Sequence, residues 1–357
     1  SLKYQWTTST ITPTESSFTA LFTNGGTISS PTGVSGTYYL WILAKDTAGN
    51  TTIVRSNAFN IDNVAPTVVF GTNGNNTYQK SHSTKVTVSD AHSGVNTSSL
   101  KYLWNTSAAT PSESSFTTFF TNGGTITSPA GVTGAYYLWI LAKDNVGNTT
   151  IIRSNTFYLD NTKPVITLNG SSTISINAGT SYTDAGATAS DAHSGINGSV
   201  TSSGTVNTNV PGTYTITYNV NDNAGNAANP VTRTVNVIDN IVPSVVFGTN
   251  GNSTYAKSYS TKVTVTDAHS GVNTSSLKYL WNTSTSTPSE ATFTSTFTNG
   301  GTISSPSGVT GTYYLWILAK DKTGNTTITR TNAFNLDNTK PVITLNGSST
   351  ISINAGT

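Results

Sequence analysis

The sequence of 357 residues contains no cysteine and no methionine, and it carries very little charge. The absence of cysteine excludes disulfide bonds and thiolate metal sites. Charged residues make up 9% of the chain, against roughly a quarter in typical globular domains. The formal net charge is only +2, which gives no electrostatic basis for binding nucleic acid or an anionic membrane. No apolar run approaches the roughly 18 residues of a transmembrane helix. We therefore expect no nucleic-acid partner and no membrane span.

Residues that favour strands and turns dominate the composition. Serine and threonine make up about a third of the chain, and threonine suits β-strands. Glycine and asparagine supply turns between alternating stretches such as KVTVSD (85–90) and ITYNVND (216–222). Turn residues recur about every 8–12 residues, which is typical of a β-sandwich. No window combines apolar residues at helical spacing with capping residues. The sequence therefore predicts an all-β fold.

An internal repeat organises the chain. The dipeptide Asp-Asn, followed by two residues and a proline, occurs at 62–66, 160–164, 239–243 and 337–341. Successive copies are 98, 79 and 98 residues apart, which indicates two kinds of module. We predict two complete long modules at 64–161 and 241–338 and one complete short module at 162–240. Residues 1–63 are then the latter part of a long module, and residues 339–357 begin a second short module.

Both kinds of module share a set of motifs. DAHSG is followed by Val or Ile, then come Gly-x-Tyr, Asp-x-x-Gly-Asn and the closing Asp-Asn. The long modules read SDAHSGV (89–95) and GTYYLWILAKDTAGN (36–50), and the short module reads NAGTSYTD (177–184) and VPGTYTITYNVNDNAGN (210–226). Over its whole length the chain resembles the immunoglobulin-like (Ig-like) repeats of bacterial cell-surface proteins of the adhesin or surface-fibre stalk type. The resemblance implies tandem Ig-like β-sandwich modules in a linear array. The long modules depart from the short one by an insertion, residues 110–134 in the first complete copy.

The motif DAHSG contains Asp, His and Ser, but we do not expect an enzyme. A hydrolytic triad needs these side chains in a spatial relay beside an oxyanion hole, which neighbours in one loop rarely provide. One histidine in each motif is also too few for a zinc site, which takes three or four ligands. We therefore predict that DAHSG forms a glycine-containing turn and that the chain has no catalytic residues.

The aspartates follow a pattern that points to metal binding. Eleven of the twelve occupy three positions: the first residue of DAHSG, the Asp-x-x-Gly-Asn turn, and the linker between modules. The Ig-like topology that the resemblance implies brings these three places together at one end of a module. Three carboxylates, with asparagine side chains and loop carbonyls, resemble the roughly six to eight oxygen ligands of Ca²⁺. The alternative is that each aspartate only caps its own turn. The expected clusters are Asp62, Asp90 and Asp144; Asp160, Asp191 and Asp222; and Asp239, Asp267 and Asp321.

One predicted strand of the long modules is apolar on both faces. It spans 36–45, 134–143 and 311–320, whereas the matching strand of the short module, 212–222, has a polar outer face. We expect the phenylalanine-rich insertion to fold across the outer face and bury it, through Phe116, Phe119 and Phe120 or through Phe293 and Phe297. The alternative is an open contact stripe between chains. The stripe consists of Tyr39, Trp41, Leu43, Tyr137, Trp139, Leu141, Tyr314, Trp316 and Leu318.

These features predict a structural stalk or spacer segment of a long extracellular microbial surface protein, which projects a distal function from the cell. Each module should advance the chain by about 35–45 Å. The expected partners are neighbouring modules and, laterally, other copies of the chain. A second hypothesis is a segment of a self-assembling surface filament or sheath, because both ends of the sequence fall inside modules. A third is an accessory carbohydrate-binding module of a secreted enzyme, which needs exposed planar aromatics such as Trp41, Trp139 and Trp316.

Overall fold

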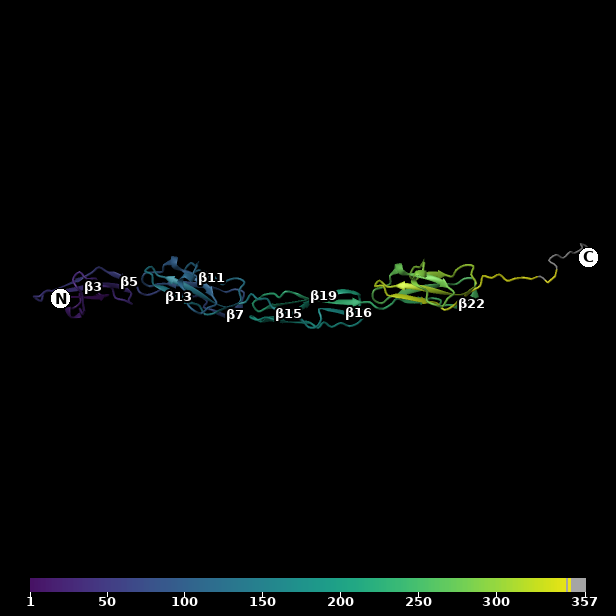
Figure 1. Cartoon of the computed structure of the whole chain (residues 1–357), viewed down its shortest axis with the longest axis horizontal. Helices are drawn as coiled ribbons and strands as arrows, with labels where there is room; N and C mark the ends of the chain where they lie inside the picture. The colour runs from purple at the N-terminus through teal and green to yellow at the C-terminus, as the bar shows by residue number, and fades with distance from the viewer. Residues whose placement is uncertain (345, 348–357) are drawn as a thin grey trace, which may run out of the picture. The chain divides into compact units, whose positions relative to one another are not determined.

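The computed structural model describes residues 1–344, 346 and 347, which form two compact units. The first comprises Ser1–Thr167, Ala187–Thr201 and Asn219–Pro230, and the second comprises Leu168–Gly186, Ser202–Tyr218 and the chain from Val231 onward. The described residues form 29 strands and five short 3₁₀ helices (Figure 1), which confirms the all-β prediction. Most of the predicted second short module, 339–357, lies outside the described residues. In the described part of the chain, no helix has the length and hydrophobicity needed to cross a lipid bilayer.

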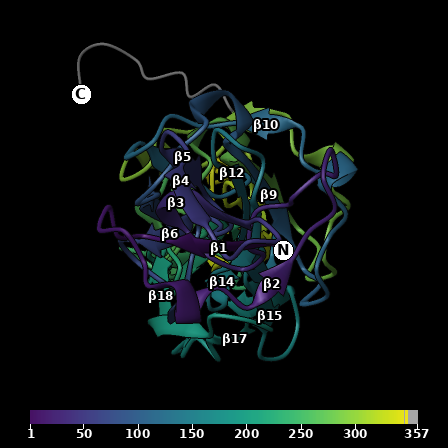
Figure 2. The same ribbon diagram turned by 90° about the vertical axis from the view of Figure 1, so that its left-hand side faces the viewer.

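The N-terminal segment forms a single five-stranded sheet. Its strands run in the order β2-β1-β3-β4, and β5 pairs with β3 (Figure 2). The strand β3 is central because it pairs with β1 over most of its length and with β4 and β5 on its other edge. The elements are β1 (Leu2–Thr7), η1 (Glu15–Ser17), β2 (Ala20–Leu21), β3 (Gly36–Lys45), β4 (Thr51–Arg55) and β5 (Phe59–Ile61).

The first complete long module is a sandwich of two sheets. A three-stranded sheet has the order β11-β8-β6, and a six-stranded sheet has the order β10-β9-β12-β14-β7, with β13 also paired to β12. All of its pairs are antiparallel except β14 with β7. The elements are β6 (Thr67–Phe70), β7 (Asn75–Gln79), β8 (Ser83–Ser89), η2 (Thr97–Ser99), β9 (Lys101–Asn105), η3 (Glu113–Ser115), β10 (Thr118–Phe119), β11 (Thr125–Thr127), β12 (Gly134–Lys143), β13 (Thr149–Arg153) and β14 (Phe157–Leu159).

The second complete long module repeats this topology. Its sheets have the orders β21-β23-β26 and β22-β29-β27-β24-β25, and β28 pairs with β27. Its elements are β21 (Ser244–Phe247), β22 (Asn252–Ala256), β23 (Ser260–Thr266), η4 (Thr274–Ser276), β24 (Lys278–Asn282), η5 (Glu290–Thr292), β25 (Ser295–Thr296), β26 (Thr302–Ser304), β27 (Gly311–Lys320), β28 (Thr326–Arg330) and β29 (Phe334–Leu336).

The short module has fewer strands, and its residues are shared between the two compact units. A pair, β15-β17, and a four-stranded sheet, β16-β20-β19-β18, make up the module. Along β19 the buried residues alternate with polar residues, as expected for a strand with one solvated face. The strands are β15 (Val165–Leu168), β16 (Thr173–Asn177), β17 (Ala187–Ser190), β18 (Ile196–Ser203), β19 (Gly212–Asp222) and β20 (Val231–Ile238). The predicted module boundaries at 64, 162 and 241 stay a prediction.

The main core of each long module lies between its two sheets. In the first, alternating residues of β8, including Val86 and Val88, meet Leu138 and Ile140 of β12 and Phe157 of β14. Each of these side chains is at most 3% exposed. The core therefore joins both sheets, which confirms the predicted tandem Ig-like sandwiches.

The outer face of β12 has a separate small core. Phe116, which follows η3 in the insertion, packs against Trp139 and Leu141, and all three are at most 4% exposed. The second long module repeats this cluster with Phe293, Trp316 and Leu318, and the N-terminal segment repeats it with Phe18, Trp41 and Leu43. The insertion thus covers the outer face within the same module.

This cover corrects two expectations. The contact-stripe alternative is wrong for the tryptophan and leucine positions, because their side chains are buried in their own modules; Tyr39, Tyr137 and Tyr314 are half-buried at the edge. The expected role of Phe119 is also wrong, since its side chain is 61% exposed. Phe120 and Phe297 pack against the main cores instead.

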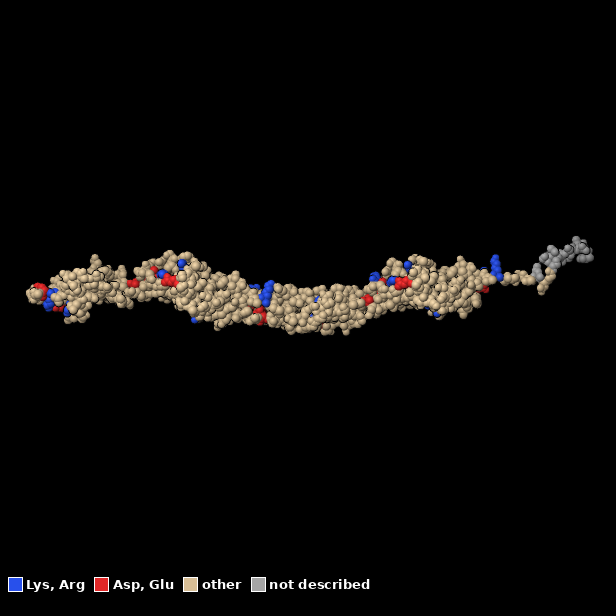
Figure 3. Space-filling view, in the orientation of Figure 1, with Lys and Arg blue, Asp and Glu red and all other residues tan. Residues whose placement is uncertain are grey.

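Charged side chains are few on the face of the molecule shown in Figure 3. This agrees with the low charge content of the sequence. Three lysines pair with glutamates of the 3₁₀ turns: Lys45 with Glu15, Lys143 with Glu113 and Lys320 with Glu290, each at 2.7 Å. These exposed pairs contribute little to stability.

Candidate metal centres

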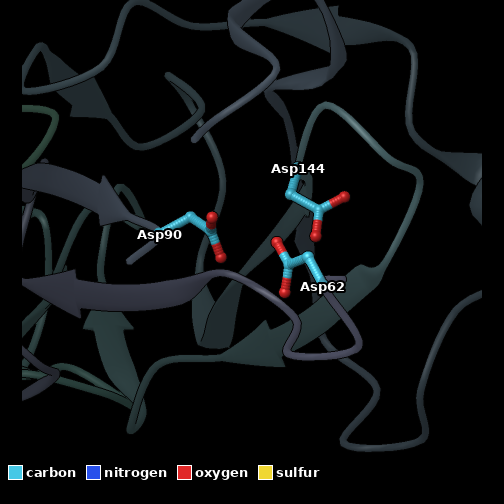
Figure 4. A group of neighbouring side chains, drawn as sticks. All are labelled: Asp62, Asp90 and Asp144. Atoms are coloured by element: carbon cyan, nitrogen blue, oxygen red, sulfur yellow. The ribbon is translucent and has the colours of Figure 1, made fainter. Parts of the chain in front are cut away.

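The structure brings together each of the three expected groups of aspartates. In cluster 1, Asp62 follows β5, Asp90 follows β8 and Asp144 follows β12. Figure 4 shows their three carboxyl groups facing a common space. In each cluster, one oxygen from every carboxylate lies within 4.8 Å of the others. Cluster 2 consists of Asp160, Asp191 and Asp222, and cluster 3 consists of Asp239, Asp267 and Asp321.

The linker aspartate is fixed by backbone donors on both sides. Oδ1 of Asp62 accepts a hydrogen bond from the Val64 N–H at 3.0 Å, and Oδ2 accepts one from the Ser93 N–H at 3.0 Å. The Ser93 donor belongs to the DAHSG turn of the following module. Asp160 and Asp239 make the same pair of contacts in clusters 2 and 3. The linker aspartate therefore caps its own turn and also binds the next module.

The DAHSG aspartate caps its own loop through one oxygen. Oδ1 of Asp90 accepts hydrogen bonds from the N–H groups of His92, at 3.2 Å, and Gly94, at 2.8 Å. Gly94 has φ +81°, a conformation that side chains other than glycine rarely adopt. The motif thus forms the predicted glycine-containing turn. Its aspartate contacts backbone N–H groups, which is a capping geometry and not the His–Asp relay of a hydrolase.

The third aspartate of each cluster organises the Asp-x-x-Gly-Asn hairpin. Oδ1 of Asp144 accepts hydrogen bonds from the N–H groups of Val146, Gly147 and Asn148, and Oδ2 accepts one from the Asn148 side chain at 2.6 Å. The same Asn148 amide donates to the carbonyl of Asp62 at 3.1 Å. The asparagine of this motif therefore ties the hairpin to the linker, and Asn226 and Asn325 repeat the contact.

Hydrogen-bond donors lower the pKa of several aspartates in the clusters. The Ser93 hydroxyl beside Asp62, together with backbone donors, lowers the pKa of that carboxyl to about 2. Burial raises the pKa of Asp144, but hydrogen bonds from Asn148 and the turn backbone outweigh it, so the pKa is below its ordinary value. The pKa values of Asp160, Asp239 and Asp321 are lowered by the same balance. Each cluster therefore contains at least one carboxylate whose hydrogen bonds favour its ionised form.

One oxygen in each cluster is left without a partner. Oδ2 of Asp90, Asp191 and Asp267 is buried and has no hydrogen-bond donor among the described residues. The turn-capping alternative accounts for the Oδ1 atoms but not for these three. The carboxylate atoms that could coordinate a metal in each cluster are oxygens. Carboxylate oxygens are hard ligands, which suit a hard cation such as Ca²⁺ or Mg²⁺.

Asp184 is the one aspartate outside the three repeated positions, and no motif predicts a role for it. It lies in a buried network of the short module, where Tyr182 and Tyr218 donate to its carboxylate at 3.0 and 2.6 Å. Arg233, which is 0% exposed, forms an ion pair with it. Burial and the neighbouring carboxylate raise the pKa of Tyr218 to about 12. The network is complete in itself and has a structural role. The only sign of this network in the sequence was Arg233, a charged residue within the alternating stretch VTRTVNV (231–237).

A family model agrees with the observed fold of the short module. Residues 166–237 match a family model described as "Bacterial surface protein, Ig-like domain". The matched stretch covers 72 of the 357 residues and nearly all of the predicted short module. This confirms the resemblance to bacterial surface Ig-like repeats that the motifs indicated. A comparison with curated protein sequences gives no match.

Several solved structures are distantly similar. The protocadherin GammaB4 extracellular domain is 14% identical, with a TM-score of 0.36; the match covers 94% of this chain and 59% of that one. Sidekick-1 immunoglobulin domains 1–5 are 12% identical, with a TM-score of 0.26 and coverage of 86% and 67%. The fibronectin(III)-like modules of Clostridium thermocellum CbhA are 12% identical, with a TM-score of 0.18 and coverage of 76% and 93%. These scores are too low to assign a shared architecture, so the fold assignment rests on the strand pairing and cores described above.

Proposed function

We propose that this chain is a stalk segment of an extracellular bacterial surface protein, in which successive Ig-like modules hold a distal part away from the cell. The observation that carries the proposal is the repeated connection at the linkers. At each of three linkers, the aspartate carboxylate accepts a hydrogen bond from the serine N–H of the next DAHSG turn. The carbonyl of the same aspartate accepts one from the asparagine of the next hairpin.

This connection suits a spacer because it restrains a short linker without a large interface. A linker with both its carboxylate and its carbonyl engaged has less freedom than a flexible chain of the same length. Each complete long module also has its own hydrophobic core, which supports a linear array stabilised by its modules and their neighbour contacts. The family match at residues 166–237 supports a location at the cell surface.

The two other hypotheses lose the apolar stripe as an available surface. A filament could have used the stripe for lateral contacts between chains, but Trp139 and Trp316 are each 3% exposed. A carbohydrate-binding module was to use the same tryptophans as planar platforms. Neither use is compatible with side chains that Phe116 and Phe293 cover.

Small-angle scattering of residues 1–357 in dilute solution tests the stalk proposal. We expect a radius of gyration well above the roughly 21 Å of one compact domain of this length. A variant lacking residues 162–240 should have a shorter maximum dimension by about one module, roughly 35–45 Å. A compact particle, or a maximum dimension that does not change with the deletion, would rule out the spacer. Negative-stain microscopy of the same material shows whether chains associate into filaments.

A further inference from the structure

Within the described part of the chain, no lysine or arginine forms a salt bridge with an aspartate of the three clusters. In cluster 1, the nearest basic group is the His92 Nδ1, 4.0 Å from Asp62 Oδ1. The lysine and arginine salt bridges among the described residues involve Glu15, Glu113, Glu290 and Asp184, and none involves a cluster aspartate. Three carboxylates this close disfavour one another's ionised form. A compensating cation would remove that repulsion.

The unpartnered oxygens point independently to the same conclusion. An unsatisfied buried carboxylate oxygen is costly, and native structures rarely keep one without a reason. Here it recurs at the same position in all three clusters, on Asp90, Asp191 and Asp267. The recurrence includes the short module, whose sequence differs from that of the long modules. In all three cases the DAHSG loop holds Oδ1 in a capping role and leaves Oδ2 free.

We propose that each cluster binds one Ca²⁺ ion, so that residues 1–357 bind three. The ligands from the chain are Oδ2 of the DAHSG aspartate and one oxygen each from the linker and hairpin aspartates. Backbone carbonyls or water complete the shell, because Ca²⁺ takes roughly six to eight oxygens. An all-oxygen set without sulfur excludes a thiolate zinc site. Ca²⁺ fits better than Mg²⁺, which demands near-ideal octahedral geometry that loops from three segments do not impose.

The ion would join the linker of one module to two loops of the next. Asp160, for example, comes from the linker, whereas Asp191 and Asp222 follow or end strands β17 and β19. An ion that binds only the folded arrangement stabilises it by mass action. Calcium would therefore set how firmly each linker is held. The proposal does not depend on the stalk function, because binding is measured by stoichiometry and the stalk by particle dimensions.

Calorimetric titration of metal-free residues 1–357 with CaCl₂ tests the proposal. We expect three ions per chain, a melting temperature that rises with calcium, and at least tenfold weaker binding of MgCl₂. The informative substitutions are D90N, D191N and D267N, since asparagine keeps the Oδ1 acceptor and removes the charge at the free oxygen. Each should remove one ion, and the triple variant should bind none. The matched control is D46N. Asp46 organises the same type of hairpin through Asn50 but belongs to none of the three clusters, so this variant should still bind three.

Three outcomes would overturn the proposal. The first is no calcium uptake and no change in melting temperature by the unsubstituted chain, a result that needs no variant to fold. The second is three ions bound by a triple variant whose circular dichroism matches that of the unsubstituted chain. The third is magnesium binding as tight as calcium binding, which would assign the clusters to a different cation.

Discussion

Arg233 is the largest fully buried side chain among the described residues. Its guanidinium pairs with Asp184 and also donates to the carbonyls of Ser171, Asn169 and Gly186. All of these partners lie in the turns and loops that frame the short module. The residue therefore holds several loops to one strand of the sheet, and its loss would leave the partly buried Asp184 carboxylate without a counter-charge.

We expect Arg233→Met to destabilise the short module by about 3–5 kcal/mol, because it removes the counter-charge of Asp184 and leaves three loop carbonyls without their donor. Hydrogen exchange with mass spectrometry on residues 1–357 should show amides of 231–237 exchanging roughly 10²- to 10⁴-fold faster, since each 1.36 kcal/mol is tenfold. The control is Arg153→Met, at an exposed arginine stacked 4.5 Å from the Tyr137 ring centre. That change should stay within about 0.5 kcal/mol. Equal effects of the two substitutions would contradict the buried-pair account.

The lowered pKa values predict a loss of stability in acid. Asp62 has a pKa of about 2 in the folded chain, against about 3.9 for an unfolded aspartate. A depressed folded pKa contributes stability that is complete above the unfolded value and lost as the pH falls through the folded value. Melting temperature measured in chelator should therefore be flat from pH 7 to about 5 and fall between about pH 4 and pH 2. Asp62→Asn should fall less steeply. A steep loss near pH 6 would instead implicate the histidines.

At the scale of strands, the long modules differ from the short one through β12 and its equivalents. Even-numbered residues of β12, such as Leu138 and Ile140, lie in the main core. Odd-numbered residues, such as Trp139 and Leu141, lie in the small core under Phe116. The insertion also contributes a strand to each of the two sheets. Its strand β10 pairs with β9 in one sheet, and its strand β11 pairs with β8 in the other.

We expect Phe116→Ala to destabilise residues 64–161 by about 3–5 kcal/mol, the usual cost of truncating a buried phenylalanine. The matched control is Phe119→Ala in the same insertion, which should cost less than about 0.5 kcal/mol because that side chain is 61% exposed. Denaturant unfolding of a 64–161 fragment, followed by the fluorescence of Trp104 and Trp139, measures both. A quencher should also reach Trp139 more readily in the first variant. Similar costs for the two substitutions would remove the small core as a source of stability.

Much of this arrangement could be predicted from the sequence, for physical reasons. Strand alternation gives the two faces of β12 directly, because side chains alternate with a period of two. The convergence of Asp62, Asp90 and Asp144 followed from their places at strand ends in a known topology. The sequence could not distinguish Phe116 from Phe119, since their orientation depends on the 3₁₀ turn η3 before them. It could not show the free oxygen of Asp90 either, because that depends on which oxygen the loop N–H groups use.

At the scale of the whole chain, stability should combine the modules and their neighbour contacts. The first long module and the short module meet through a small set of polar contacts. Ser194 N–H donates to Asp160 at 3.1 Å, Asn226 donates to the Asp160 carbonyl at 3.0 Å, and Lys80 donates to the Gly225 carbonyl. The ring of Tyr78 lies 5.9 Å from that of His193. We expect these few contacts to add to the stability of both modules without being needed for either module to fold.

We therefore expect fragments 64–161 and 162–240 each to fold alone and melt cooperatively in chelator. In fragment 64–240 the short module should gain about 1–3 kcal/mol, because fragment 162–240 lacks Asp160 and leaves the donors of Ser194 and Asn226 unpaired. The measurement is selective because residues 162–240 contain no tryptophan. Tryptophan fluorescence then follows only the long module, and far-ultraviolet circular dichroism follows both. Asn226→Ala in fragment 64–240 should remove part of the gain. A short module that melts at the same temperature with and without its neighbour would mean that the linker contacts position the modules without stabilising them.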